Sequence, residues 1–306
     1  MAQGALAQRC YPRKRGRTEV ATSDQLLVVI DPLSRHTDSE SVRIAKDVLS
    51  AGAASTKVCL PEGPEDFARA LQKRGSRRPV VVGDDRALLR AVSLLHRQRE
   101  LAGCTLSLVP VGGAGVLARS LGVPASTVAA ARAALDGAER RLDLLVDDSD
   151  GVVLGAVGIP SVASVPSPAD ESPQMDEEAS AHHSWLRTCQ SFVRTLATRP
   201  PRLSAPAVPG PSRLRVEVDG VTLVDLDQPV EAVSVTPAGD KGGAAVEVRP
   251  VSVGAEATPL RAVGRRVSVS GPSFRYHADS VVTGPVRTRT WTVWEGAWGL
   301  TLPTSA

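Results

Sequence analysis

Aromatic residues are scarce in this chain, and long apolar runs are missing. Aromatic side chains make up 3% of the 306 residues, and only Tyr11 and Phe67 precede Trp185. The region before Trp185 therefore needs an aliphatic core and lacks the base-stacking platform of nucleic-acid-binding domains. No apolar run approaches the ~18 residues of a membrane span, and the basic start leads into no apolar signal segment. We expect a cytoplasmic protein without a transmembrane segment or a nucleic-acid partner.

Cysteine and lysine are also rare. The four cysteines are widely scattered, with no Cys-x-x-Cys pair and no zinc-like spacing, which favours buried reduced thiols. Only 5 of the 36 basic residues are lysine. Guanidinium groups match phosphate oxygens, so the arginine excess fits a phosphate-reading surface. The many alanines favour the simpler explanation, a GC-rich genome.

The length and texture of the chain indicate two domains. A 42% hydrophobic content over 306 residues suits about two domains of ~150 residues. Residues 1–24 form a basic polar tail that we expect to be disordered. Residues 25–142 are predicted to be an α/β domain, and residues 143–303 a β-rich domain. The tail and the linker at 200–211 are polar or rich in proline.

The first domain alternates strands and helices. Residues 26–30 are a continuous apolar run, as in a strand buried on both faces, and Thr37 with Glu40 resembles a capping box. Such alternation predicts right-handed βαβ units around a parallel sheet. Further strands are expected at 57–60, 79–82, 105–109 and 141–146, and helices at 37–50, from 64, at 86–98, up to 121 and at 126–135.

The second domain is predicted to be an antiparallel β-sandwich. Residues 164–181 are expected to form a mobile acidic loop and residues 182–198 an amphipathic helix. Alternating runs begin at 214, with a hairpin turn at Asp219-Gly220 and a closing strand pair at 288–294 and 298–302. At strand spacing, Trp291, Trp294 and Trp298 are expected to fill the sandwich core.

Three turns follow the strands of the predicted parallel sheet, where ligands bind in such folds. They are Asp31–Arg35, Gly83–Arg86 and the glycine-rich segment from Pro110 to Gly115. Backbone N–H groups in such turns can hold phosphate, although any one of them alone is an ordinary connector. The Walker P-loop and the Gly-x-Gly-x-x-Gly motif after the first strand are both missing.

The order of the three turns resembles the catalytic domain of the diacylglycerol kinase and sphingosine kinase superfamily. That family has Asn-Pro-x-Ser-Gly, Gly-Gly-Asp-Gly-Thr and Pro-x-Gly-Thr segments in this order, followed by Ala-Arg and a Leu-Gly-x-Pro turn. The matching residues are Pro32, Ser34, Gly83, Asp84, Pro110, Gly112, Ala118, Arg119, Leu121, Gly122 and Pro124, with Asp143 in a Leu-Asp-Leu strand. The resemblance covers about residues 25–303. It implies ATP and Mg²⁺ as cofactors and a lipid hydroxyl as the phosphate acceptor.

Several family positions are changed, and the resemblance is therefore to a degenerate member. Asp31 and Arg35 replace Asn and Gly, and Asp85 and Arg86 replace Gly and Thr. A carboxylate at Asp85 would repel a triphosphate unless a metal bridges them. Of the family's late Asp-Gly-Glu motif only Asp279 remains, and Asp240 is better explained as a hairpin turn. The candidate cofactor-binding residues are Asp31, Pro32, Ser34, Arg35, Gly83, Asp84, Asp85, Arg86, Gly112 and Gly113; no catalytic residue or metal ligand is assigned.

Three functions remain open. The first is a non-catalytic nucleotide- or lipid-binding regulatory module, with ATP and Mg²⁺ binding weak or lost. The second is an active ATP-dependent lipid kinase in which Asp84 and Asp85 hold magnesium. The third is a protein-interaction module that uses the acidic loop from Asp170 to Glu178 or the basic tail. Peripheral membrane contact is compatible with the first two, and the oligomeric state is not predicted.

Overall fold

A computed structural model of the chain describes residues 25–160, 211–239, 242–251 and 258–304. The predictions for the basic tail, the acidic loop, the helix at 182–198 and Asp240 lie outside the described residues, as does nearly all of the linker at 200–211.

The N-terminal part contains the expected parallel sheet, in the order β2-β1-β3-β4. The strands are β1 (Gln25–Ile30), β2 (Ser55–Cys59), β3 (Arg78–Gly83) and β4 (Thr105–Pro110). The apolar run of β1 is buried from Leu26 to Ile30, because helices cover the sheet on both faces. This confirms the α/β prediction for the first part of the chain.

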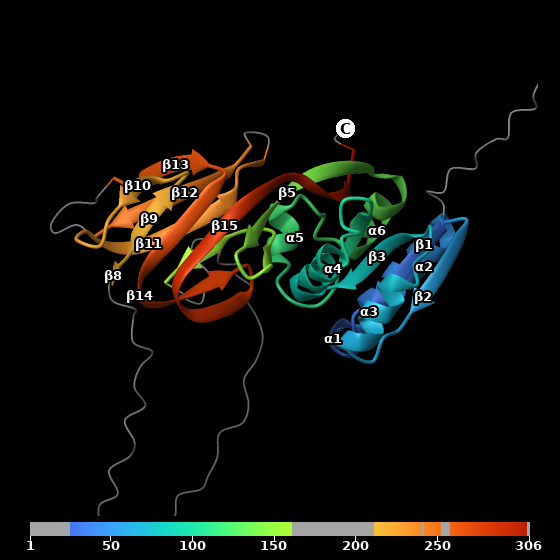
Figure 1. Cartoon of the computed structure of the whole chain (residues 1–306). Helices are drawn as coiled ribbons and strands as arrows, with labels where there is room; N and C mark the ends of the chain where they lie inside the picture. Colours follow the sequence, from blue (N-terminus) through green and yellow to red (C-terminus); the bar gives the residue numbers. More distant parts are fainter. Residues whose placement is uncertain (1–24, 161–210, 240–241, 252–257, 305–306) are drawn as a thin grey trace, which may run out of the picture.

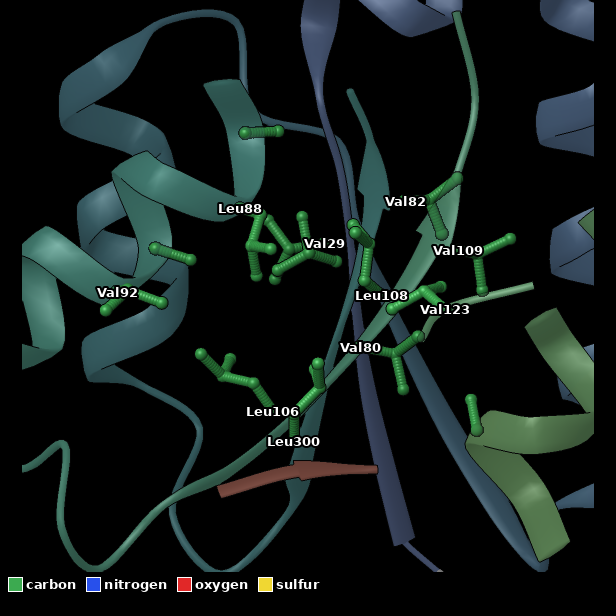
Figure 2. Close-up of a cluster of buried hydrophobic side chains, with 14 of the residues drawn as sticks. Val29, Val80, Val82, Leu88, Val92, Leu106, Leu108, Val109, Val123 and Leu300 are labelled. Atoms are coloured by element: carbon green, nitrogen blue, oxygen red, sulfur yellow. The ribbon is translucent and has the colours of Figure 1, made fainter. Parts of the chain in front are cut away.

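Six helices connect or flank these strands within the described residues. They are α1 (Pro32–Thr37), α2 (Ser39–Gly52), α3 (Pro64–Gln72), α4 (Asp85–Arg97), α5 (Val116–Ser120) and α6 (Thr127–Asp136). Leu88 and Val92 of α4 pack on one face of the sheet, and α6 lies on the other (Figure 2). The central strands are thus enclosed by aliphatic side chains, as the scarcity of aromatic residues predicts.

The first helical region starts differently from the prediction. The turn after β1 is itself a short helix, α1, with Asp31 as its N-cap and Pro32 in its first turn. The next helix is capped by Asp38, whose carboxylate accepts a hydrogen bond from the Ser41 amide at 3.0 Å. The predicted capping box at Thr37 is therefore wrong. A carboxylate one residue later caps more strongly because its hydrogen bond is charge-assisted.

The C-terminal part is antiparallel, as predicted. Three strands, β5 (Ala138–Asp147), β6 (Val152–Val153) and β7 (Val157–Ile159), lead into it. The remaining strands are β8 (Ser212–Arg213), β9 (Arg215–Val218), β10 (Val221–Val224), β11 (Pro229–Pro237), β12 (Ala244–Pro250), β13 (Leu260–Gly264), β14 (Arg266–Ala278) and β15 (Val281–Leu302). The domain boundary predicted between residues 142 and 143 falls inside β5.

One strand, β15, links the two parts. It pairs antiparallel with β14 and β5, and its end pairs parallel with β4 at Gly299 and Leu300. Figure 1 shows this strand running from the β-rich part to the parallel sheet. The predicted pair of separate strands at 288–294 and 298–302 is therefore one strand, with an irregularity in its pairing with β5 between Trp294 and Trp298.

This irregularity separates the three tryptophans. Trp291 is buried in the C-terminal cluster, whereas Trp298 is buried in the N-terminal cluster with Leu300 and Leu302. Trp294 is 50% exposed. The prediction that all three fill one sandwich core is wrong, because β15 passes from one core to the other.

Candidate functional site

The three predicted turns meet at the carboxyl edge of the parallel sheet. The Asp31 amide donates to the Val82 carbonyl at 2.9 Å, and the Val111 amide donates to the Gly83 carbonyl at 3.1 Å. The buried Ser34 hydroxyl donates to the Val111 carbonyl at 2.9 Å. These bonds bring the ends of β1, β3 and β4 together, so residues up to 77 positions apart form one site.

Glycine is required where these turns approach one another. A Cβ atom on Gly83 would lie 2.7 Å from the Cβ atom of Ala87 and 2.9 Å from that of Asp31. Gly112 and Gly113 have positive φ angles of 70° and 77°, which other residues rarely adopt. The backbone of the third turn can therefore lie directly beside Asp84 and Ser34.

The acidic residues of the first two turns bind groups of the protein itself. The carboxylate of buried Asp31 accepts from the Leu33 amide at 3.1 Å and from the Arg90 guanidinium at 2.7 Å. Asp84 caps α4 by accepting from the Ala87 amide at 3.0 Å. Each of these carboxylates thus stabilises the N-terminus of a helix in the absence of any ligand.

Asp85 reaches across to the third turn. Its two carboxylate oxygens accept from the amides of Leu117 and Ala118, both at 2.9 Å. The loop is therefore held by Asp85 and two backbone groups, while Arg86 makes no ion pair with it. The side chains of Arg35 and Arg86 have no hydrogen-bond or ion-pair partner among the described residues, and Arg86 is exposed.

A cavity of about 300 Å³ lies beside the glycine turn. Its wall is formed by the backbone from Pro110 to Gly115 and by Asp38, Ser41, Ala118, Arg119, Ala125 and Thr127. The exposed guanidinium of Arg119 has no ion-pair partner in the described part of the chain. Backbone amides, a threonine hydroxyl and an arginine are groups that bind phosphate.

The β-rich part completes the site through Asp279, which sequence reasoning noted only as a motif remnant. Its carboxylate accepts from the amides of Leu154, Gly155 and Ala156 at 2.8, 2.7 and 3.1 Å. Gly155 also approaches the first domain, because a Cβ atom there would lie 2.9 Å from a methyl of Leu117. No local sequence signal pairs Asp279 with a turn more than 120 residues earlier.

The charge of Asp85 acts on the carboxyl group of Asp279. Burial raises the pKa of the Asp279 carboxyl above its ordinary value, the three backbone hydrogen bonds act in the opposite direction, and the charge of Asp85 raises it further. Two carboxylates from different parts of the chain therefore lie on either side of the boundary between α5 and the 154–156 turn.

Asp147 holds the β5–β6 turn that leads to this segment. Its Oδ1 atom accepts from the Ser149 amide and hydroxyl at 2.8 and 2.7 Å and from the Gly151 amide at 2.8 Å. Burial opposes ionisation of this carboxyl, but these hydrogen bonds and the nearby Arg289 guanidinium together hold the pKa of Asp147 below its ordinary value of 3.8.

We expect Asp147→Asn to lower the free energy of unfolding by about 1–2 kcal/mol at neutral pH, because charge-assisted hydrogen bonds are weakened. A depressed pKa stabilises the folded state above the unfolded pKa, and this contribution is lost as pH falls through the folded pKa. The difference between wild type and variant should therefore shrink below about pH 4. Urea denaturation at a series of pH values measures it. Asp227→Asn, at an exposed carboxylate, is the control, and a pH-independent difference would contradict the assignment.

Residues 25–146 match the family model for the diacylglycerol kinase catalytic domain. This segment is similar to the diacylglycerol kinase family. The match covers β1 to β5 and therefore includes every turn of the carboxyl edge.

Solved structures extend the likeness to the whole fold. Three solved structures of a Bacillus anthracis str. Sterne protein are similar to this chain. One of them bears the name of a diacylglycerol kinase, and the other two bear that name provisionally. The TM-scores are 0.63 to 0.65 at 12% to 14% sequence identity. Each match covers 91% of this chain and 97% of the Bacillus chain. No curated protein sequence matches this chain. None of the helices in the described ranges has the length and apolar composition needed to span a membrane.

Proposed function

We propose that this chain is a non-catalytic member of the diacylglycerol kinase family that binds a nucleotide or lipid phosphate as a regulatory module. The observation that carries the non-catalytic part of the proposal is the bidentate contact of Asp85 with the Leu117 and Ala118 amides. A carboxylate of the protein here uses two backbone donors next to the glycine turn. It also places a negative charge where a phosphate would approach, which costs affinity.

The donor set does not fit the divalent metal that this family uses with ATP. Asp31, Asp84 and Asp85 are each engaged by amides or by Arg90. Among the described residues, no three His, Cys, Asp or Glu side chains are placed to hold a metal ion. We therefore derive no step through a metal at this site.

The phosphate-binding part of the site fits better. Gly112 and Gly113 leave the backbone of the third turn accessible, and a cavity of about 300 Å³ lies beside it with Arg119 at its wall. Phosphoryl transfer depends on positioned metal and charge neutralisation. A site that keeps the phosphate donors and loses the metal ligands would bind without efficient transfer.

An active lipid kinase is the second candidate, and one observation favours it. Asp85 and Asp279 are close enough for the charge of one to raise the pKa of the other, and paired carboxylates attract divalent cations. The third candidate, an interaction module, depends on segments outside the described residues.

Thermal-shift titration with Mg-ATP, combined with a phosphate-transfer assay, distinguishes these functions. Ligand at 100 times its Kd stabilises by about 2.7 kcal/mol, which raises Tm by several degrees in a chain of this size. We expect a shift of at least about 2 °C at millimolar Mg-ATP, with no labelled phosphate transferred to diacylglycerol. Transfer that is lost in Asp84→Ala would establish the kinase instead, and no shift would remove both nucleotide-dependent functions.

We expect Asp85→Gly, which restores the family residue, to tighten ATP binding about tenfold or more. The change removes a repulsive charge and frees two amides, and a charge-assisted hydrogen bond contributes about 1.5–3 kcal/mol. Glycine inside a helix should cost about 1 kcal/mol of stability. Isothermal titration calorimetry measures the affinity. Glu65→Gly, an exposed carboxylate in the first turn of α3, is the matched control; equal affinities in both variants would refute the role given to Asp85.

A further inference from the structure

A second cavity, of about 460 Å³, lies away from the family site. It is formed where α4 ends, where β4 is about to begin and where β15 has its irregularity, together with the β5–β6 turn. Because α4 begins with Asp85 at the carboxyl edge and ends with Arg97, the cavity lies at the opposite, amino edge of the parallel sheet. Nothing in the resemblance to lipid kinases accounts for it.

The floor of this cavity contains a polar pair, the buried ring of His96 and the exposed carboxylate of Asp150. His96 is 8% exposed, and its Nε2 atom lies 2.8 Å from Oδ1 of Asp150. The ring of His96 is 5.2 Å from that of Trp294, with an interplanar angle of 58°. An aromatic surface is thus held in place by a hydrogen bond between α4 and the β5–β6 turn.

Trp294 is half exposed at this cavity, so its indole presents an apolar face that a ligand can cover. The adjoining backbone is fixed by several bonds. Arg141 donates to the Gly296 carbonyl at 3.0 and 2.7 Å and to the Ala102 carbonyl at 3.0 Å. Asp143 accepts from the Gly296 amide at 2.8 Å. The two rims, at residues 102 and 296, are therefore joined before any ligand arrives, which lowers the entropic cost of binding.

The carboxylates around the cavity have partners, whereas two arginine side chains there have none in the described part of the chain. Both carboxylates are engaged, Asp150 by His96 and Glu295 by Arg265 at 3.3 Å. The exposed guanidinium groups of Arg97 and Arg99 have no ion-pair or hydrogen-bond partner among residues that the structure describes. Arg99 is held at a φ of 59° by a hydrogen bond from its amide to the His96 carbonyl at 2.9 Å. The charged side chains at the cavity that lack a hydrogen-bond or ion-pair partner among the described residues are thus these two arginines.

We propose that this cavity binds a small planar aromatic molecule that carries a carboxylate. Its ring packs against Trp294 and the edge of His96, and its carboxylate pairs with Arg97 and Arg99. Arginine forms bidentate bonds with carboxylates, and a half-exposed indole gains by covering its apolar face. The site is independent of the proposed nucleotide function, since it shares no lining residue with the cavity beside the glycine turn.

The test uses 1-naphthoate as the probe and the full chain as the protein. Isothermal titration calorimetry and tryptophan fluorescence should show saturable one-to-one binding with a Kd of about 1 mM or below, as expected for a ligand of this size. The neutral analogue 1-naphthalenemethanol should bind about tenfold more weakly. Equal binding of the two compounds, or no saturable binding of 1-naphthoate, would overturn the proposal.

Variants assign the binding to this cavity. Trp294→Ala, Arg97→Gln and Arg99→Asn should each weaken 1-naphthoate binding about tenfold. Asparagine at 99 tolerates the positive φ, so that variant removes the charge without straining the backbone. Arg132→Gln, at an exposed arginine of α6, is the matched control and should bind as wild type does. Unchanged affinity in all three cavity variants would place the probe elsewhere and contradict the assignment.

Discussion

Trp298→Ala is expected to lower the free energy of unfolding by about 3–5 kcal/mol, the usual range for removing a buried tryptophan. Trp298 is fully buried in the N-terminal cluster, and its indole N–H donates to the Asp143 carbonyl at 3.3 Å. The segment that carries it is the end of β15, which pairs with both β4 and β5. The cavity that the substitution leaves at residue 298 would weaken the packing between β15 and the parallel sheet.

Urea or thermal denaturation followed by circular dichroism measures this effect. Trp294→Ala is the control, because it removes the same side chain four residues earlier on the same strand, where half of it is exposed. It should cost less than about 1.5 kcal/mol. Similar losses in the two variants would contradict the burial of Trp298 in the N-terminal cluster.

Asp279→Ala should destabilise the chain by about 2–4 kcal/mol. Three amides, those of residues 154 to 156, lose their acceptor, and each unsatisfied buried donor costs about 1–3 kcal/mol, less where water reaches it. Alanine at a φ of 51° adds roughly 1 kcal/mol of backbone strain. The loss should concentrate where the β-rich part meets α5, through Gly155 and Leu117.

Two measurements distinguish a local loss of stability near Asp279 from destabilisation of the whole chain. Hydrogen exchange should accelerate at residues 154–156 more than at the central strand β1. Asp279→Asn should recover part of the stability, because asparagine tolerates the positive φ and keeps one acceptor oxygen. Ser280→Ala, at the exposed neighbouring residue, should be nearly neutral. An Asp279→Ala variant as stable as wild type would show that water replaces the carboxylate.

The carboxylates of the candidate site make contacts that no local pattern could predict. Asp85 was expected to repel phosphate, but its two partners are amides 32 and 33 residues away. The partner of Asp31 is Arg90, 59 residues later. A sequence shows which residues carry charge and which turns they follow. It does not show which donor each carboxylate reaches once the turns are packed.

The pairing of β15 was unpredictable for the same reason. Its two halves alternate as ordinary strands, so a hairpin-like pair was a reasonable prediction from residues 288–302. The irregularity between Trp294 and Trp298 moves the second half into register with β4, and this depends on sheet edges contributed by other segments. Trp294, at one end of that irregularity, lines the cavity beside His96.

The alternation of apolar strands with helices, and the alternating runs after residue 214, were by themselves sufficient to predict a parallel sheet followed by an antiparallel region, and the scarcity of aromatic residues predicted an aliphatic core for the first. Those patterns depend on periodicity over a few residues, which the chain carries locally. Only the tertiary structure decided that a carboxylate of the protein engages the donors beside the glycine turn, and that the last strand returns to the first core. Such contacts join residues distant in sequence, and their geometry arises only when whole elements pack together.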